Sequence, residues 1–141
     1  MTHWLIPANI KFYDVFAAFE QAETHWPMNV KIACNDTVYI YLAVPYKQIG
    51  FMCSVSAIGL NLDEAIEFVL PFIKGEMRND GSSKQFMKLK AVHPISIDNR
   101  SALSLKNLKQ NGLNGMNGML MGARKLENNP DLLKYIRKNL S

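Results

Sequence analysis

The chain has 141 residues, of which 48% are hydrophobic and 20% carry a charged side chain. This length and composition predict one globular domain over residues 1–141 with a single core, and they exclude a disordered chain. No run approaches the roughly 18 consecutive apolar residues of a membrane-spanning helix. The first residues, Met1 to His3, show no signal peptide. We therefore expect a cytoplasmic protein that does not associate with membranes.

The net charge of +4 is unevenly distributed along the chain. Residues 1–100 hold nine Lys or Arg and ten Asp or Glu, whereas residues 101–141 hold seven and two, a local excess of +5. Such asymmetry is typical of a surface that meets phosphate groups, and a solvated basic helix face is the alternative. The candidate phosphate-binding residues are Lys106, Lys109, Arg124 and Lys125.

Residues for covalent, metal or cofactor chemistry do not form a motif. Cys34 and Cys53 are too few for a disulfide framework, so we expect reduced thiols. The histidines and cysteines lack metal-ligand spacing, and phosphate-binding glycine motifs and nucleophile elbows are absent. His93 precedes a proline and is expected on an edge strand rather than as a catalytic base. The acidic residues are scattered along the chain, so they do not form the carboxylate cluster of a metal-dependent nuclease. We expect no metal, no cofactor and no enzymatic activity.

The first third of the chain predicts a strand, a helix and a loop. His3–Pro7 is short and apolar and ends at a proline, as a strand does where its hydrogen-bond donor is lost. Residues Lys11–Ala22 have helical periodicity. The inward face of this helix would carry Phe12, Val15, Phe16 and Phe19. Thr24–Asn29 is predicted as a loop, because Pro27 restricts Trp26 to extended geometry.

The middle of the chain predicts a hairpin followed by a helix. Thr37–Val44 is rich in β-branched and aromatic residues and should form a central strand, with Ile49–Ile58 antiparallel to it. Asn61 can cap a helix, and Pro71 should kink or end it. The buried side of this helix would carry Ile66, Val69, Leu70 and Ile73.

The last part of the chain predicts one strand and two helices. Asn79–Ser83 is a loop, and Phe86–Val92 alternates as a strand with one wet face does. Ser104 begins a short helix that ends at Asn111–Gly112. Asn129 and Pro130 begin the last helix. The core-facing residues of these two helices would be Leu105, Leu108, Leu132, Leu133, Ile136 and Leu140.

Two features of this pattern bear on architecture. The segment from Gly112 to Gly122 is rich in glycine and methionine, so it either approaches a ligand closely or is a flexible connection. The mixture of short antiparallel strands with peripheral helices predicts an α+β fold, a partly closed barrel.

Aromatic residues at strand ends and in loops are the main candidates for ligand binding. A nucleobase stacks on such rings with about 1–3 kcal/mol each. The aromatic candidates are Trp4, Tyr13, Trp26, Tyr41 and Tyr46. Asn9 can both donate to and accept from the edge of a base. Trp4 and Tyr41 are equally explained as core residues, whereas Trp26, in the predicted loop, is harder to explain as core.

The order and spacing of short motifs resemble the EVE domain, a member of the PUA-like superfamily. The matching segments are Trp4–Asn9, Lys11–Asp14, Ala18–Glu20, Trp26, Asn35–Asp36, Val38–Tyr41, Pro45–Tyr46 with Ile49, Leu103–Leu105, Leu108–Lys109, Asn111–Leu113 and Leu132–Ile136. The resemblance implies a small, partly closed, mainly antiparallel β-barrel with peripheral helices. It also implies a pocket for a flipped base. Members of the family are similar to readers of modified cytosine in restriction-modification systems, and superfamily relatives read RNA modifications.

Together these observations predict a nucleic-acid-binding reader of a modified cytosine, such as 5-methylcytosine, with DNA expected before RNA as the partner. Trp4, Trp26 and Tyr46 would stack on the flipped base, and Asn9 would read its edge. A nuclease partner is implied by the resemblance. The alternatives are a protein-interaction module of a restriction or regulatory system, an RNA-modification binder, and a small enzyme that acts on a nucleotide.

Overall fold

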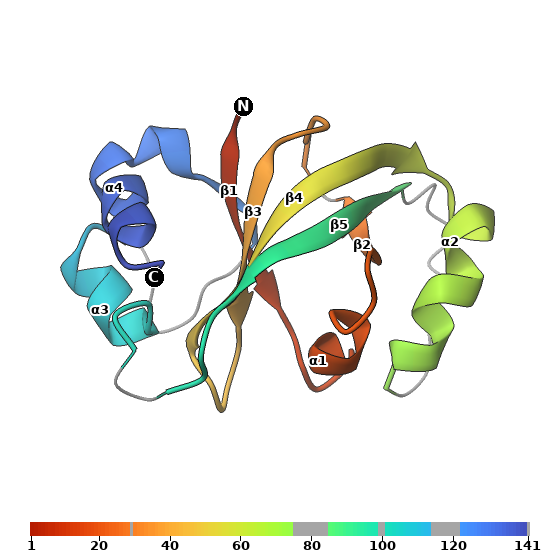
Figure 1. Ribbon diagram of the computed structural model, residues 1–141, viewed down its shortest axis with the longest axis horizontal. Helices are drawn as coiled ribbons and strands as arrows, with labels where there is room; N and C mark the ends of the chain where they lie inside the picture. The colour runs from red at the N-terminus through yellow and green to blue at the C-terminus, as the bar shows by residue number, and fades with distance from the viewer. Residues whose placement is uncertain (29, 75–84, 99–100, 114–121, 141) are drawn as a thin grey trace.

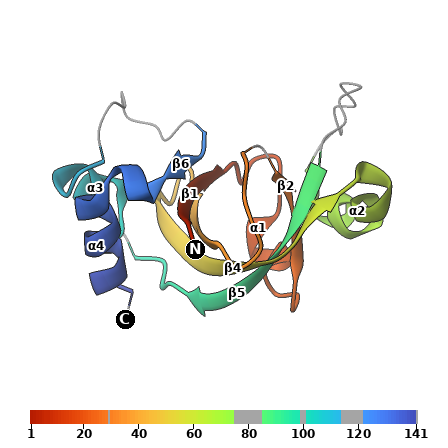
Figure 2. The ribbon, with the colours of Figure 1, turned by 90° about the horizontal axis from the view of Figure 1, so that it is seen from above.

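The protein is organised around one mixed, six-stranded sheet. The computed structural model describes residues 1–28, 30–74, 85–98, 101–113 and 122–140. The strands are β1 (His3–Ala8), β2 (Thr24–Met28), β3 (Thr37–Leu42), β4 (Gln48–Leu60), β5 (Gln85–Pro94) and β6 (Arg124–Lys125). They lie in the order β2-β5-β4-β3-β1-β6, so β2 and β6 are the edges of a curved, open sheet (Figures 1 and 2). Only the β1–β3 pair is parallel among these strands.

Helices lie on both sides of the sheet. Their bounds are α1 (Val15–Ala18), α2 (Leu62–Val69), α3 (Leu105–Gln110) and α4 (Pro130–Lys138), with short 3-10 turns η1 (Leu70–Phe72) and η2 (Leu126–Asn128). In Figure 1, α3 and α4 lie to one side of the sheet, and α1 and α2 lie to the other. This arrangement confirms the predicted α+β class.

The central strand β3 separates two cores, so the expectation of a single core is wrong. All six of its residues are buried, as predicted for the middle of the sheet. Val38, Ile40 and Leu42 point into one core, and Tyr39 and Tyr41 point into the other. We call the first side the aromatic face, because the phenylalanines near α1 and Trp26 pack there, and the second the helical face, because α3 and α4 cover it.

The predicted helix starts are confirmed by their capping hydrogen bonds. The side chain of Asn61 accepts from Glu64 N at 2.8 Å at the start of α2. Ser104 and Asn129 begin α3 and α4 in the same way. The helix α2 ends immediately before the turn that contains Pro71, as predicted. Leu70, however, is exposed on that turn and does not belong to the buried side.

The helix predicted over Lys11–Ala22 is wrong in length. Only Val15–Ala18 is helical, and Asp14 caps it by accepting from Ala17 N. The residues before it form a turn, in which Phe12 N donates to Asn9 O at 3.2 Å. The turn carries Phe12 outward, 64% exposed, although helical periodicity placed its ring toward the core. Local turn and capping hydrogen bonds therefore override the periodicity in this segment.

The loop predicted over Thr24–Asn29 is also wrong. Residues Thr24–Met28 form β2, which pairs with β5 at the edge of the sheet. A proline is tolerated there because an edge strand needs ladder donors on one side only. Trp26 is 7% exposed and belongs to the core, so the interpretation of this residue as poorly suited to a core is wrong as well.

Several other predictions are answered or lie outside the described residues. The hairpin β3–β4 and strand β5 are confirmed, and β1 runs one residue past Pro7. Cys34 and Cys53 are free thiols, and burial raises the pKa of Cys53. The loop Asn79–Ser83 and residues 114–121 of the glycine-rich segment are not described. Within the described part of the chain, none of the helices is long and apolar enough to cross a membrane.

Candidate functional site

Two loops meet at one end of the sheet. Because β1 and β3 are parallel neighbours, the chain leaves both strands at the same end. The turn over residues 9–12 follows β1, and the turn over residues 43–47 follows β3 (Figure 1). The amide of Ala43 donates to Ala8 O at 3.2 Å and so holds the two segments together. We call this region the loop end.

A continuous row of aromatic rings runs along the aromatic face at the loop end. Each ring contacts the next with centroids 4.4 to 6.1 Å apart. In order, the rings of this aromatic row are Tyr46, Phe16, Phe51, Phe19, Trp26, Tyr13 and Phe72. The row joins the turn after β3, the α1 region, β4, β2 and η1, which are distant in sequence. Its middle is buried, and both of its ends are half-buried.

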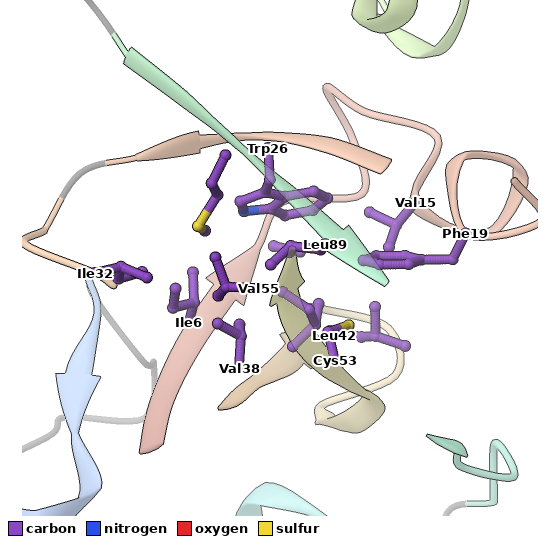
Figure 3. Packing of buried hydrophobic residues seen from close by; sticks show 13 residues of the cluster. Ile6, Val15, Phe19, Trp26, Ile32, Val38, Leu42, Cys53, Val55 and Leu89 are labelled. Atoms are coloured by element: carbon purple, nitrogen blue, oxygen red, sulfur yellow. The ribbon is translucent and has the colours of Figure 1, made fainter. Parts of the chain in front are cut away.

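Trp26 lies in the buried middle of this row. Figure 3 shows its indole above the aliphatic side chains of Val55 and Leu89, with Phe19 to one side. Phe19 and Trp26 are tilted with centroids 5.7 Å apart, and Tyr13 meets Trp26 edge-on at 5.5 Å. Trp26 therefore packs edge-on against Tyr13 from within the core, and contact with a ligand would come through the half-buried rings.

The hydroxyl of Tyr13 is buried without a hydrogen-bond partner. No other buried side-chain nitrogen or oxygen in the described residues lacks a partner. Burial raises the pKa of Tyr13 to about 12, so the group stays protonated and can both donate and accept. The backbone around it is fixed, because Tyr13 bridges to Ile73 and Asp14 N donates to Phe72 O at 2.7 Å. A rigid, unsatisfied polar group in an aromatic setting is a candidate for contact with a ligand.

Trp4 lies at the opposite end of β1 from the loop end. Ala8 is four positions farther along the strand, a distance of about 13 Å. Its indole Nε1 donates to Asp36 Oδ2 at 3.1 Å. Burial raises the pKa of Asp36, but hydrogen bonds from Ala33 N, Thr2 N and the indole outweigh this effect and lower it. The Trp4 indole is therefore part of a structural network at the start of β1.

The other two predicted base-binding residues are on different sides of the sheet. Asn9 is exposed at the loop end, and its Oδ1 accepts from Lys11 N at 3.0 Å to shape the turn. Tyr41 is 3% exposed on the helical face, where burial raises its pKa to about 12. The structure thus brings Asn9, Tyr13, Trp26 and Tyr46 to one region and leaves Trp4 and Tyr41 outside it.

The predicted phosphate-binding residues are spread over the molecule. Lys106 is close to the loop end, since its neighbour Leu105 donates from its amide to Lys47 O at 2.8 Å. Lys109 is exposed farther along α3. Arg124 and Lys125 form β6, which pairs with the start of β1, away from the loop end. The four residues do not form one surface with the aromatic row.

The structure adds three lysines that sequence reasoning missed. Lys11, Lys47 and Lys74 are exposed on the turn after β1, the turn after β3 and the segment after η1. Lys74 N donates to Phe12 O at 2.8 Å, which places this segment against the turn over residues 9–12. These lysines belong to the region of balanced charge, so no excess in the sequence marked them. Only the pairing of distant segments reveals them as a group.

A separate groove of about 410 Å³ lies beside β6. It is lined by both predicted basic residues of β6 and by residues of η2 and α4. Its described lining holds leucine, asparagine and alanine but no aromatic ring, so it lacks a surface on which a base would stack. In the described residues, no group of three His, Cys, Asp or Glu is placed to hold a metal ion.

Comparison with known proteins bears on the fold. No family model matches the chain, and no curated protein matches its sequence. Among solved structures, ASCH of Zymomonas mobilis matches with a TM-score of 0.65 at 12% identity, over 99% of this chain and 96% of that one. A Pseudomonas putida protein matches with a TM-score of 0.64 at 13% identity, over 99% of both chains.

A third match is human THYN1 in complex with 5-methylcytosine-containing DNA. Its TM-score is 0.63 at 11% identity, over 98% of this chain and 96% of that one. The chain therefore has a PUA-like fold. This confirms the predicted PUA-like α+β fold and its mainly antiparallel sheet. The predicted partly closed barrel is not formed, because β2 and β6 are separate edges of an open sheet. Since both ASCH proteins and THYN1 match, the EVE assignment within this fold stays a prediction.

Proposed function

We propose that this chain is a DNA-binding domain that receives a single modified cytosine, flipped out of the duplex, at the loop end. The observation that carries the proposal is the Tyr13 hydroxyl, which is buried without a partner among aromatic rings. In this proposal Tyr13 bonds to the edge of the base, Trp26 supports Tyr13 from below, and Tyr46 supplies an additional ring at the other end of the row.

A nucleobase supplies the hydrogen-bond partner that this environment lacks. A buried hydroxyl without a partner is unfavourable, because it has lost its water without gaining another hydrogen bond. A flipped base brings polar edge atoms together with a flat apolar face that stacks on aromatic rings. The rings at both ends of the row are half-buried and offer surface for stacking, whereas a hydrogen bond to the buried Tyr13 hydroxyl requires the side chains around it to move.

The charges at the loop end support a nucleic acid as the ligand. Lys11, Lys47 and Lys74 are exposed there, and phosphate neutralisation by such lysines supplies most sequence-independent affinity. Asp14, two residues after the turn over residues 9–12, caps α1 with its carboxylate. The lysines would hold the backbone while the row receives the base.

The choice of modified cytosine rests on two supports. Human THYN1, which shares the fold, was solved with DNA that contains 5-methylcytosine. An apolar, aromatic environment also accommodates an added methyl group better than a polar one does. The resemblance to EVE domains extends the proposal to a role beside a nuclease in a restriction-modification system.

The substitution Tyr13→Phe tests the proposal, with Tyr135→Phe as the matched control. Tyr135 donates to Ala102 O at 2.7 Å on the helical face, away from the loop end. Titrations would use DNA duplexes with cytosine or 5-methylcytosine, and RNA of the same sequence, at two salt concentrations. We expect wild-type protein to prefer methylated DNA, with affinity falling as salt rises. Tyr13→Phe should weaken binding about 3- to 12-fold, the value of one hydrogen bond.

Stability separates this role from a structural one. Because the Tyr13 hydroxyl has no partner within the described residues, its removal should leave the free energy of unfolding unchanged or slightly raised. Tyr135→Phe should lower stability by about 1 kcal/mol and leave binding intact. Absence of binding to every oligonucleotide at low salt would contradict the proposal. A preference for the RNA would show that RNA, and not DNA, is the partner.

A further inference from the structure

The turn over residues 9–12 presents an exposed aromatic ring directly beside Tyr13. Phe12 is 64% exposed, whereas the next residue is half-buried in the aromatic row. A phenylalanine so exposed contributes little to the core. Successive side chains thus point in different directions, one toward the protein and one toward solvent.

The backbone of this turn is held on both sides. Within the turn, Phe12 N donates to Asn9 O at 3.2 Å, and Lys11 N donates to Asn9 Oδ1 at 3.0 Å. Across the turn, Lys74 N donates to Phe12 O at 2.8 Å, and Lys74 Nζ donates to Ile10 O at 3.1 Å. The exposed ring is therefore mounted on a fixed support.

The same turn carries positive charge. Lys11 precedes Phe12 in the chain and is exposed. The ammonium of Lys74 is fastened to the turn by its hydrogen bond to Ile10 O. An apolar ring on a turn that also carries two cations suits a ligand that offers phosphates on its outside and stacked apolar surfaces within, which is the structure of a DNA duplex.

We propose that Phe12 is a wedge that enters the DNA base stack and fills the space left by the base that Tyr13 receives. This inference rests on the proposed function and deepens it, because it states how the duplex is kept open. Apolar side chains inserted between base steps partly unstack them, and a flipped base leaves a gap that must be filled or closed. Because the two residues are adjacent in the chain and point in different directions, Tyr13 can hold the flipped base while Phe12 fills the gap that this base leaves.

A wedge acts only on stacked DNA, which gives a direct test. Phe12→Ala and Phe12→Leu would be compared with wild type on a duplex that contains 5-methylcytosine and on the corresponding methylated single strand. Fluorescence anisotropy would measure both affinities. Phe68→Ala is the matched control, since this exposed phenylalanine lies on α2 and stacks on His25.

We expect Phe12→Ala to lower duplex affinity about tenfold and to change single-strand affinity less than about twofold. Phe12→Leu should retain most of the duplex affinity, because leucine is also an apolar wedge. Phe68→Ala should bind both forms as wild type does. Since Phe12 is so exposed, its substitution should leave the thermal midpoint unchanged.

The outcomes distinguish this inference from the proposed function. If wild type binds methylated duplex and Phe12→Ala binds it equally well, the wedge is wrong and the proposed function stands. If Phe12→Ala loses affinity equally for duplex and single strand, Phe12 is a stacking surface, which also overturns the wedge. If wild type binds no DNA, the proposed function fails and the wedge with it.

Discussion

The two faces of the sheet are built from different side chains for different tasks. The helical face is filled by leucine and isoleucine from α3, α4 and the segments beside them, which leave Tyr39 and Tyr41 buried. The aromatic face carries a row of rings with half-buried ends and a buried hydroxyl that lacks a partner. The first face gives the sheet support. The second holds a polar group without a hydrogen-bond partner beside half-buried rings, so a ligand is expected on this face.

The largest expected effect separates residues that stabilise the fold from residues that bind DNA. Ile136 on α4 is fully buried in the helical face, so Ile136→Ala should lower the free energy of unfolding by about 2–5 kcal/mol. Chemical denaturation measures this loss. The DNA affinity of the folded fraction should stay within about twofold of wild type, because α4 covers the face opposite to the row. A fall in affinity as large as the one produced by Tyr13→Phe would place the ligand across both faces.

A second test asks which face meets the phosphates. Lys11→Ala combined with Lys47→Ala should reduce the slope of log affinity against log salt by about 2 for duplex DNA, since each phosphate contact contributes roughly 0.9. Arg124→Ala combined with Lys125→Ala should change the slope less, because β6 pairs with the start of β1, away from the loop end. The reverse result would show that the phosphates contact the basic C-terminal region, as the charge excess of the sequence predicted.

The smallest expected effect concerns the contact between α2 and the edge strand β2. His25 on β2 stacks on Phe68 of α2 at 4.5 Å. Burial lowers the pKa of His25, Lys88 lowers it further, and Glu23 opposes the change. Since the unfolded chain then binds protons more readily, stability should fall as the pH drops below about 6.5.

Thermal midpoints and hydrogen exchange between pH 7.5 and 5 would measure this effect. Protection should weaken at α2 and β2 before it weakens at α4, and His25→Gln should remove the difference. An equal pH dependence in His25→Gln would assign the titration to another group.

Local sequence signals predicted most of the fold. The dense β-branched run of β3 and the capping residues Asn61, Ser104 and Asn129 specify their elements through nearby atoms, so they could be recognised without the structure. The errors arose where tertiary pairing decides. Trp26 and Pro27 look like a loop until β5 is placed beside them.

The candidate site was only half predictable for the same reason. Tyr13 and Tyr46 were recognised as aromatics near strand ends, but the row that joins them needs rings from the α1 region, β4 and β2. Phe12 was assigned to a buried helix face because periodicity does not reveal a turn held by Lys74, sixty-two positions later in the chain. No local pattern contains such a contact.

The parallel pairing of β1 with β3 also has a consequence for folding kinetics. The hairpin of β3 and β4 closes through a short turn, whereas β1 reaches β3 only after residues 9–36 have been arranged, and long loops close more slowly. The loop end needs both strands, since the turn after β1 carries Tyr13 and the turn after β3 carries Tyr46. The region that would grip a base is thus completed late, when the N-terminal strand docks onto a hairpin that is already formed.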